Sequence, residues 1–203
     1  MNFARELSDR TGIFARLLRI KQWTKNLLLF AGAAFARQIF VPRQFGRAAM
    51  AFSSFCLLSS ALYVLNDLVD LEADRRHPKK RFRPLAAGLV GVRSAAVFAG
   101  GLFLAGFALA CFLGPAFLVL ALLYAALTAA YTFSLKRIVI IDVMALALGF
   151  VVRAVAGAVA VRVTISPWLL ACTMSLALFL ALVKRRQEMR ANEGGGRAVL
   201  GSY

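Results

Sequence analysis

The sequence predicts an all-α membrane protein, a polytopic bundle of transmembrane helices. Hydrophobic residues make up 61% of the 203 positions, far more than a single soluble core requires. They form six long runs, and most of these approach the ~20 residues that a helix needs to cross about 30 Å of hydrocarbon. Helices are expected because backbone groups in lipid have no water to bond, which excludes an open sheet.

The six spans are predicted at residues 26–41, 48–66, 94–112, 116–134, 139–161 and 167–183. The first is the weakest, because Arg37 and Gln38 interrupt it. It could be a cleavable signal peptide, but the long basic segment before it and the five further runs favour an uncleaved span. We assign residues 1–183 to the helical bundle and 184–203 to a cytoplasmic basic tail or loop, with no separate soluble domain.

The basic residues predict the orientation of the bundle. The chain carries 25 Lys and Arg against nine Asp and Glu, a formal net charge of +16. Twenty of the basic residues fall on one side: in the N-terminal segment, the 67–93 connection, the turn near 136 and the tail. The positive-inside rule places this side, with both termini, on the cytoplasmic face of the cell membrane. Because the charges lie at the ends of apolar runs, we expect contact with anionic membrane lipids and no nucleic-acid partner.

Acidic residues gather at one predicted membrane boundary. Asn66, Asp67, Asp70 and Asp74 form the pattern N-D-x-x-D-x-x-x-D, and positions i, i+3 and i+7 share one face of a helix. Three carboxylates in one volume repel each other unless they share a cation. Oxygen ligands suit Mg²⁺, which is usually held by one or two carboxylates and by substrate phosphates. The row therefore predicts a catalytic Mg²⁺ site at Asp67, Asp70 and Asp74 that binds a phosphate or diphosphate.

The alternative for this row is a solvated helix end whose acids pair with the basic residues that follow. Glu72, which faces away from the row, fits that alternative. The segment R-H-P-K-K-R-F-R-P at 76–84 favours the phosphate site, because it presents Lys80 and Arg83 beside the carboxylates. We expect His77 to have a hydrogen-bonding role in this turn rather than to act as a base.

Together with R-P-L-x-x-G at 83–88, the acidic pattern resembles the first aspartate-rich motif of the UbiA-type intramembrane prenyltransferase superfamily. Members of that superfamily bind a Mg²⁺-diphosphate in a helical bundle that opens to the cytoplasm. H-P-x-K-R-F-R-P at 77–84 resembles its decaprenyl-phosphate phosphoribosyltransferase branch. Six more segments are similar: R-I-K-Q-W-T-K-N at 19–26, Y-T-F-S-L-K at 131–136, D-V at 142–143, R-A-V-A-G at 153–157, S-P-W at 166–168 and L-V-K-R-R-Q-E at 182–188.

The resemblance implies transfer of a 5-phosphoribosyl group from phosphoribosyl diphosphate to a polyprenyl (decaprenyl) phosphate, with release of diphosphate. It also implies further substrate-binding residues in the similar segments: Asn66, Lys21, Lys25, Tyr131, Lys136, Lys184 and Arg185. Each basic residue also has a simpler interpretation, as an interfacial anchor or as a charge that fixes the topology. Two other functions stay open, an aromatic-acceptor polyprenyltransferase of the same superfamily and a noncatalytic membrane protein.

The number of spans and of late acidic residues bears on how complete the site is. The resemblance implies about nine spans and a second acidic cluster late in the chain. Here six spans are predicted, and past Asp142 only Glu188 and Glu193 are acidic, so we expect an incomplete prenyltransferase-like domain. Asp142, just inside a span, is expected to have a partner, and Arg153, near mid-membrane, is expected to face the bundle interior.

Overall fold

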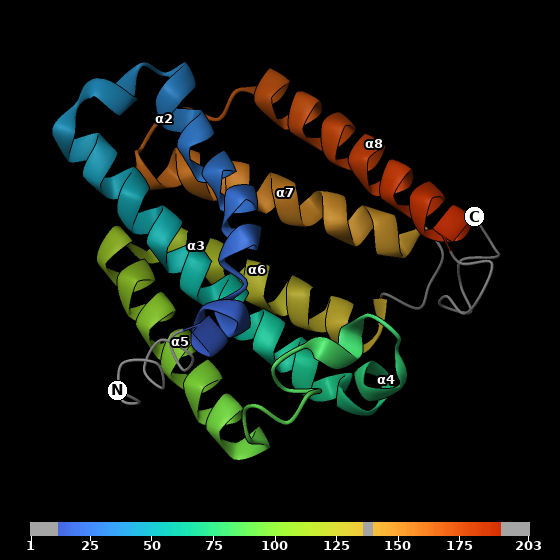
Figure 1. Cartoon of the computed structure of the whole chain (residues 1–203). Helices are drawn as coiled ribbons and strands as arrows, with labels where there is room; N and C mark the ends of the chain where they lie inside the picture. The colour runs from blue at the N-terminus through green and yellow to red at the C-terminus, as the bar shows by residue number, and fades with distance from the viewer. Residues whose placement is uncertain (1–11, 136–139, 192–203) are drawn as a thin grey trace.

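The computed structural model describes residues 12–135 and 140–191, apart from the side chains of Lys184 and of residues 188–191. Every regular element in these ranges is helical, which confirms the predicted all-α bundle (Figure 1). In chain order they are η1 Ile20–Phe30, α2 Ala31–Phe35, η2 Gln38–Phe40, α3 Pro42–Val69, α4 Leu71–Arg76, η3 Lys80–Phe82, α5 Val92–Leu113, α6 Pro115–Phe133, α7 Ile141–Ala160 and α8 Pro167–Ala191. η1, η2 and η3 are 3₁₀ helices.

Five helices are long and apolar enough to cross a membrane: α3, α5, α6, α7 and α8. They coincide with the last five predicted spans, with two differences at the ends. α3 begins at Pro42 rather than at 48, and α8 continues through the predicted boundary at 183 to Ala191. Proline begins α3, α6 and α8, where its missing N–H has no helical partner to lose.

The first predicted span has a different structure from the other five. Its segment forms η1 and α2 instead of one α-helix, and the helix ends before Arg37, which has a left-handed φ of 56°. A 3₁₀ helix rises about 2.0 Å per residue, so the 11 residues of η1 and the five of α2 extend about 30 Å together. The composite segment is therefore about as long as the ~30 Å hydrocarbon core of a membrane is thick, and whether it crosses the membrane stays a prediction.

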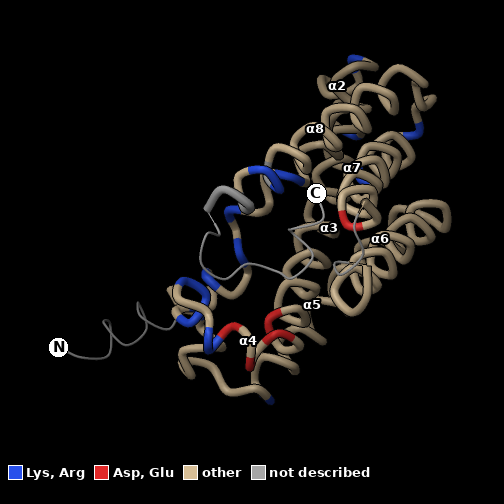
Figure 2. The backbone as a smooth tube through the Cα atoms, turned by 90° about the vertical axis from the view of Figure 1, so that its right-hand side faces the viewer, with Lys and Arg blue, Asp and Glu red and all other residues tan. Residues whose placement is uncertain are grey.

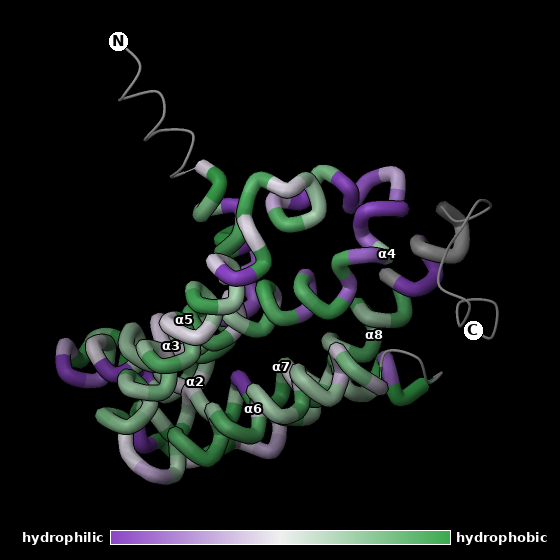
Figure 3. Tube along the Cα trace, turned by 90° about the horizontal axis from the view of Figure 1, so that it is seen from below, coloured by the Kyte–Doolittle hydropathy of each residue, from purple (hydrophilic) through white to green (hydrophobic). Residues whose placement is uncertain are grey.

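Two helices form the centre of the bundle. In their most apolar 18-residue windows, α3 and α7 are each 61% buried, against 22% for α5 and α6 and 18% for α8. The outer helices carry exposed apolar side chains, including Leu104 on α5, Leu122 on α6 and Phe179 on α8. Figure 3 shows hydrophobic residues along these helices and hydrophilic residues gathered around α4. The outer faces therefore have the composition of a lipid-facing surface.

The composite segment packs against α7 through glycines. A Cβ added at Gly157 on α7 would lie 2.1 Å from the backbone oxygen of Leu29. A Cβ added at Gly32 on α2 would lie 2.9 Å from the Cα of Ala158. Only residues without a side chain allow the backbones to approach this closely, as at other helix contacts in membranes.

Candidate functional site: a charged cluster at the α3–α4 junction

A cluster of opposite charges lies where α3 ends and α4 begins (Figure 2). Nη1 of Arg83 donates hydrogen bonds to Oδ1 of Asp67, at 3.0 Å, and to Oδ2 of Asp74, at 2.5 Å. Nζ of Lys80 lies 3.8 Å from Oδ1 of Asp74, and Nη2 of Arg19 donates to Oδ1 of Asp67. Both carboxylates are buried. Two acids and three cations thus form one network, which we call the α3–α4 cluster.

The turn after α4 brings the basic residues of the 76–84 segment back to the carboxylates. Nδ1 of His77 accepts hydrogen bonds from the backbone N–H of Lys79, at 3.1 Å, and of Lys80, at 3.3 Å. The N–H of Arg81 donates to the carbonyl of His77 at 3.2 Å. The expected hydrogen-bonding role of His77 is therefore confirmed: its ring stabilises the turn that brings Lys80 and Arg83 to Asp74.

Arg19 is a member of the cluster that was not among the predicted site residues. It has a left-handed backbone, with a φ of 51°, and its guanidinium lies 5.1 Å from the ring centroid of Tyr63 on α3. This cation–π contact and the bond to Asp67 attach the start of η1 to the last turns of α3. The signal in the sequence is its place as the first residue of the 19–26 segment, although a basic residue there is also typical of a topology charge.

The expected row of three carboxylates is only partly formed. Asp67 and Asp74 share Arg83, whereas Asp70 lies at the break between α3 and α4, with a φ of −91° and a ψ of 9°. Within the described residues, no group of three or more Asp, Glu, His or Cys side chains could hold a metal ion. The three-carboxylate geometry is thus corrected to a pair, and the role of Asp70 stays a prediction. Glu72 pairs instead with Arg75, at 2.9 Å and exposed, as the solvated alternative predicted.

A second buried cluster joins α6, α7 and α8. Nη2 of Arg185 donates to Oδ1 of Asp142 at 2.8 Å, and Nε lies 2.6 Å from Oδ2. The same Nη2 donates to the hydroxyl of Tyr131 at 3.2 Å. Both charged residues are 2% exposed. Asp142 therefore has the partner expected for an intramembrane acid, and that partner is Arg185, which the resemblance had assigned to substrate phosphate.

The remaining predicted site residues are less fully placed. Lys21 and Lys25 lie on η1 with exposed side chains, and Asn66 is half-buried in the last turn of α3. Lys136 and the side chain of Lys184 lie outside the described residues. Trp23, between the two lysines, donates to the hydroxyl of Ser60 on α3 at 3.0 Å. The indole bond shows that this part of η1 is attached to α3.

Arg153 faces the interior, as predicted. Its Nε donates to Oδ1 of Asn26 on η1 at 2.8 Å, and Nη2 donates to the hydroxyl of Tyr124 on α6 at 2.7 Å. The third donor, Nη1, reaches the carbonyl of Gly149 at 2.8 Å. The side-chain amide of Asn26 in turn donates to Ser59 on α3 at 3.2 Å. Arg153 therefore connects η1, α6 and α7, and through Asn26 it is linked to α3, which is a structural role.

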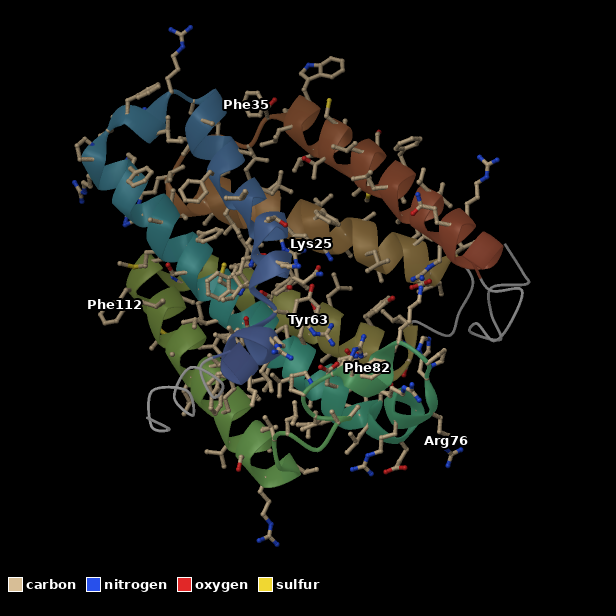
Figure 4. All side chains as sticks on the ribbon, in the orientation of Figure 1. Lys25, Phe35, Tyr63, Arg76, Phe82 and Phe112 are labelled. Atoms are coloured by element: carbon tan, nitrogen blue, oxygen red, sulfur yellow. The ribbon has the colours of Figure 1, made fainter. Side chains whose placement is uncertain are left out.

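A mainly apolar cavity of about 400 Å³ lies beside Lys25, between η1, α2, α7 and α8. Its other lining residues include Leu28, Phe150 and Leu176. Figure 4 shows Lys25 and Tyr63 in the middle of the molecule, with Phe82 of the returning connection below them. A cationic side chain at the edge of an apolar cavity suits an amphipathic ligand with an anionic head.

Comparison with known proteins identifies the family. Residues 27–198 match the sequence profile of the UbiA prenyltransferase family. The chain belongs to this family. It is 41% identical over 188 residues to the decaprenyl-phosphate phosphoribosyltransferase of Corynebacterium glutamicum, and 36% identical to that of Mycolicibacterium smegmatis. Each match covers 91% of this chain, which spans about three-fifths of the length of those relatives, 57% and 59%.

Solved structures of the UbiA family have the same fold. A UbiA homologue from Archaeoglobus fulgidus, bound to GPP and Mg²⁺, aligns over 83% of this chain with a TM-score of 0.73 and 23% identity. A digeranylgeranylglyceryl phosphate synthase aligns over 95% of this chain with a TM-score of 0.76 and 20% identity. This chain covers 60% and 69% of those chains. At such identities the likeness shows the helical fold alone. The substrate has to be inferred from the residues of the site.

Proposed function

We propose that the protein transfers a 5-phosphoribosyl group from phosphoribosyl diphosphate to a polyprenyl phosphate and releases diphosphate. The observation that carries the proposal is the α3–α4 cluster, because two buried carboxylates beside three cations suit a metal-bound diphosphate. Membership in the UbiA family supports a transferase of this kind. The names of its relatives, at 36% and 41% identity, favour phosphoribosyl transfer over an aromatic acceptor.

The residues present fit Mg²⁺. Oδ1 of Asp67 and Oδ2 of Asp74 both lie within 3.0 Å of the same nitrogen of Arg83, so the two oxygens converge on one point. Carboxylate oxygens are ligands that Mg²⁺ accepts, and one or two of them are enough when substrate phosphates complete the shell. Asp67 and Asp74 would hold the ion, with Asp70 as a further candidate. When bound, Mg²⁺ would neutralise charge on the diphosphate.

The cations of the cluster would bind the donor. We propose that Arg83, Arg19 and Lys80 turn from the carboxylates to the diphosphate oxygens, which the two guanidiniums can hold bidentately. The acceptor phosphate oxygen then bonds to C1 of the ribose while the bond from C1 to the diphosphate oxygen breaks. The acceptor is already anionic, so no side chain has to remove a proton. The contribution of the chain is positioning and charge stabilisation.

The acceptor would enter from the membrane. The apolar cavity beside Lys25 can receive part of a polyprenyl chain, while the Lys25 ammonium attracts the phosphate at its end. Lys21, Asn66, Tyr131, Lys136 and Lys184 stay proposed substrate contacts. Arg185 would have to leave Asp142 to become one. The soluble donor would come from the side that carries the basic residues, which we propose is the cytoplasmic side of the cell membrane.

The test uses membranes that contain the chain, incubated with radiolabelled phosphoribosyl diphosphate, decaprenyl phosphate and Mg²⁺. We expect label in the lipid extract, lost when EDTA is added and in Asp67→Asn. Glu72→Gln is the matched control, because this acid of the same segment is exposed and pairs only with Arg75 among the described residues. An unlabelled lipid extract, while membranes with the Corynebacterium relative give product, would reject the proposal. Prenylation of an aromatic acid from an isoprenyl diphosphate would favour the alternative.

Donor binding is measured separately, because the chain spans about three-fifths of the length of its relatives. Purified protein is heated with Mg²⁺ and phosphoribosyl diphosphate together, and with each alone. We expect the pair to raise the Tm more than either component, and Asp67→Asn to remove the difference. A chain that binds the donor without forming product would retain the site but lack part of the catalytic machinery. A chain that does neither would contradict the assignment of the α3–α4 cluster.

A further inference from the structure

A small basic pocket lies at the end of the bundle opposite the α3–α4 cluster. Its volume is about 100 Å³, and its lining residues are Arg43, Gln44, Arg47 and Arg162. The first three come from the start of α3, and Arg162 follows the end of α7. Two elements that are distant in sequence thus bring three guanidiniums to one small cavity.

No carboxylate of the described residues is near enough to balance these charges. Asp67 lies about 30 Å from Arg47 along α3, since an α-helix rises about 1.5 Å per residue. Asp142 lies at the other end of α7 from Arg162, about 27 Å from Ala160 by the same measure. Figure 2 shows Lys and Arg at the end beside α2, with no described Asp or Glu there. Grouped like charges repel unless an anion joins them.

Arg47 is held in place by backbone atoms. Its Nε donates to the carbonyl of Ala160, at the end of α7, at 2.6 Å, and its Nη2 donates to the carbonyl of Leu113, at the end of α5, at 3.1 Å. These helix ends offset part of its charge. They do not account for Arg43 and Arg162, which are exposed and have no ion pair within the described ranges 12–135 and 140–191.

The backbone at Arg162 is also unusual. This residue has a φ of 57°, and the N–H of Val163 donates to the carbonyl of Ala158 at 3.1 Å, so α7 ends in a Schellman turn. Glycine is the usual residue at that left-handed position. The same backbone conformation is less favourable for an arginine, because its Cβ is crowded there. Gln44 adds a buried Oε1 with no hydrogen-bond partner among the described residues. Rotation of its amide by 180° would present an NH₂ group to the pocket.

We propose that this pocket binds a phosphate group, either free or in the headgroup of an anionic lipid of the opposite leaflet. The phosphate would lie between Arg43 and Arg162, with Nη1 of Arg47 as a third donor, because guanidinium forks match phosphate oxygens. The site is separate from the proposed transferase centre. It would attach the ends of α3 and α7 to a single ligand on the far side of the membrane.

The test compares two double variants of the purified chain in a neutral detergent. Arg43→Gln/Arg162→Gln removes the two exposed arginines and leaves the backbone contacts of Arg47. Arg37→Gln/Arg93→Gln makes the same change in charge at two exposed arginines outside the pocket. Each protein is titrated with phosphatidylglycerol, with phosphatidylcholine and with inorganic phosphate. Lipid binding is followed by native mass spectrometry and phosphate binding by Tm.

We expect the native chain to prefer phosphatidylglycerol, and Arg43→Gln/Arg162→Gln to weaken its binding about tenfold or more. The Arg37→Gln/Arg93→Gln protein and Arg83→Gln should keep that preference, which separates this pocket from the α3–α4 cluster. Competition by inorganic phosphate would show that the free ion is sufficient, and its absence that the lipid is required. Equal loss in both double variants, or equal affinity of the native chain for the two lipids with no response to phosphate, would overturn the proposal.

Discussion

Arg83 is the residue on which the α3–α4 cluster depends. One of its nitrogens bonds to both Asp67 and Asp74, two carboxylates that would otherwise repel each other in a buried setting. A guanidinium thus stands where a metal ion could lie between the same oxygens. Binding a metal-bound diphosphate would require Arg83 to exchange carboxylate for phosphate oxygens, which are equally good partners for its fork.

Arg83→Gln should therefore lower the proposed transferase activity about 100-fold, the usual order for losing one donor that stabilises developing charge. Arg75→Gln is the matched control, because its exposed pair with Glu72 contributes little, and we expect its activity to stay within about twofold. Label transfer to lipid, normalised to folded protein, is the measurement. Full activity in Arg83→Gln would remove this residue from the mechanism.

Asp142 and Arg185 form the buried ion pair of the second cluster. Asp142→Asn should lower the free energy of unfolding by about 3 kcal/mol or more, because it leaves the Arg185 charge buried and unbalanced. Asp142→Leu/Arg185→Met should recover most of that loss, since it removes both charges. Unfolding of the purified proteins by SDS measures the difference, with exposed Glu72→Gln as the control. Equal losses in the single and double variants would show that the pair is not coupled.

For single residues, the sequence predicted the environment of a buried charge better than the residue with which that charge pairs. An acid just inside a span needs a counter-charge and a mid-membrane arginine needs an interior, so both Asp142 and Arg153 could be placed in general terms. That Arg185 is the partner of Asp142 could not be predicted, because the two residues are brought together only by the packing of α7 on α8. Arg19 was missed for the same reason: its contacts are with Asp67 and Tyr63, on a different helix.

Among the elements, the segment of η1 and α2 departs most from what its sequence predicts. Its apolar composition predicts a span but does not distinguish a 3₁₀ from an α-helix. The 3₁₀ form has poorer intrinsic hydrogen bonding and rarely runs for 11 residues, so tertiary contacts must stabilise it. Those contacts are with Ser59 and Ser60 on α3 and with Arg153 and Gly157 on α7.

Gly157→Ala should displace η1 from α7. The new Cβ would lie 2.1 Å from the Leu29 carbonyl oxygen, so the backbones must separate, at a cost of about 1–3 kcal/mol. In a Trp168→Phe background, Trp23 is the only tryptophan left, and its emission should shift to the red as its bond to Ser60 weakens. Both the Tm and the emission spectrum are recorded.

The matched control is Gly101→Ala on α5, where an added Cβ meets no atom within 4 Å. This change should leave the emission spectrum unaltered and stabilise the helix slightly, by about 0.5–1 kcal/mol. An unshifted emission spectrum in Gly157→Ala would show that the close contact with Leu29 does not fix the position of η1.

For the whole molecule, the length and apolar composition of the runs were enough to predict the five long helices, because backbone groups in lipid can form hydrogen bonds only within a helix or a closed barrel. The break at Asp70 was not predicted, since a hydrophilic segment outside the hydrocarbon is under no such constraint. Because the helix breaks at Asp70, the three carboxylates that would share one face of an ideal helix form only a pair in the structure.

The orientation of the bundle stays a prediction from charge. Arg76→Cys and Trp168→Cys place a thiol at exposed positions on α4 and at the start of α8. In intact cells, a membrane-impermeant maleimide should label the second and should reach the first only after permeabilisation. The unaltered chain, with its three native cysteines, measures the background. The opposite pattern would invert the topology and place the α3–α4 cluster outside the cytoplasm.

The contacts of η1 also set the order in which the protein can be assembled during synthesis. This segment precedes all of these partners in the sequence: its polar partners on α3 are followed by the arginine and the glycine of α7 that contact it. The bond between Arg153 and Asn26 joins residues 127 positions apart, so η1 has its full set of contacts only once α7 has been made. The position of the proposed substrate contacts on η1 thus depends on a helix that follows them by more than 100 residues in the sequence.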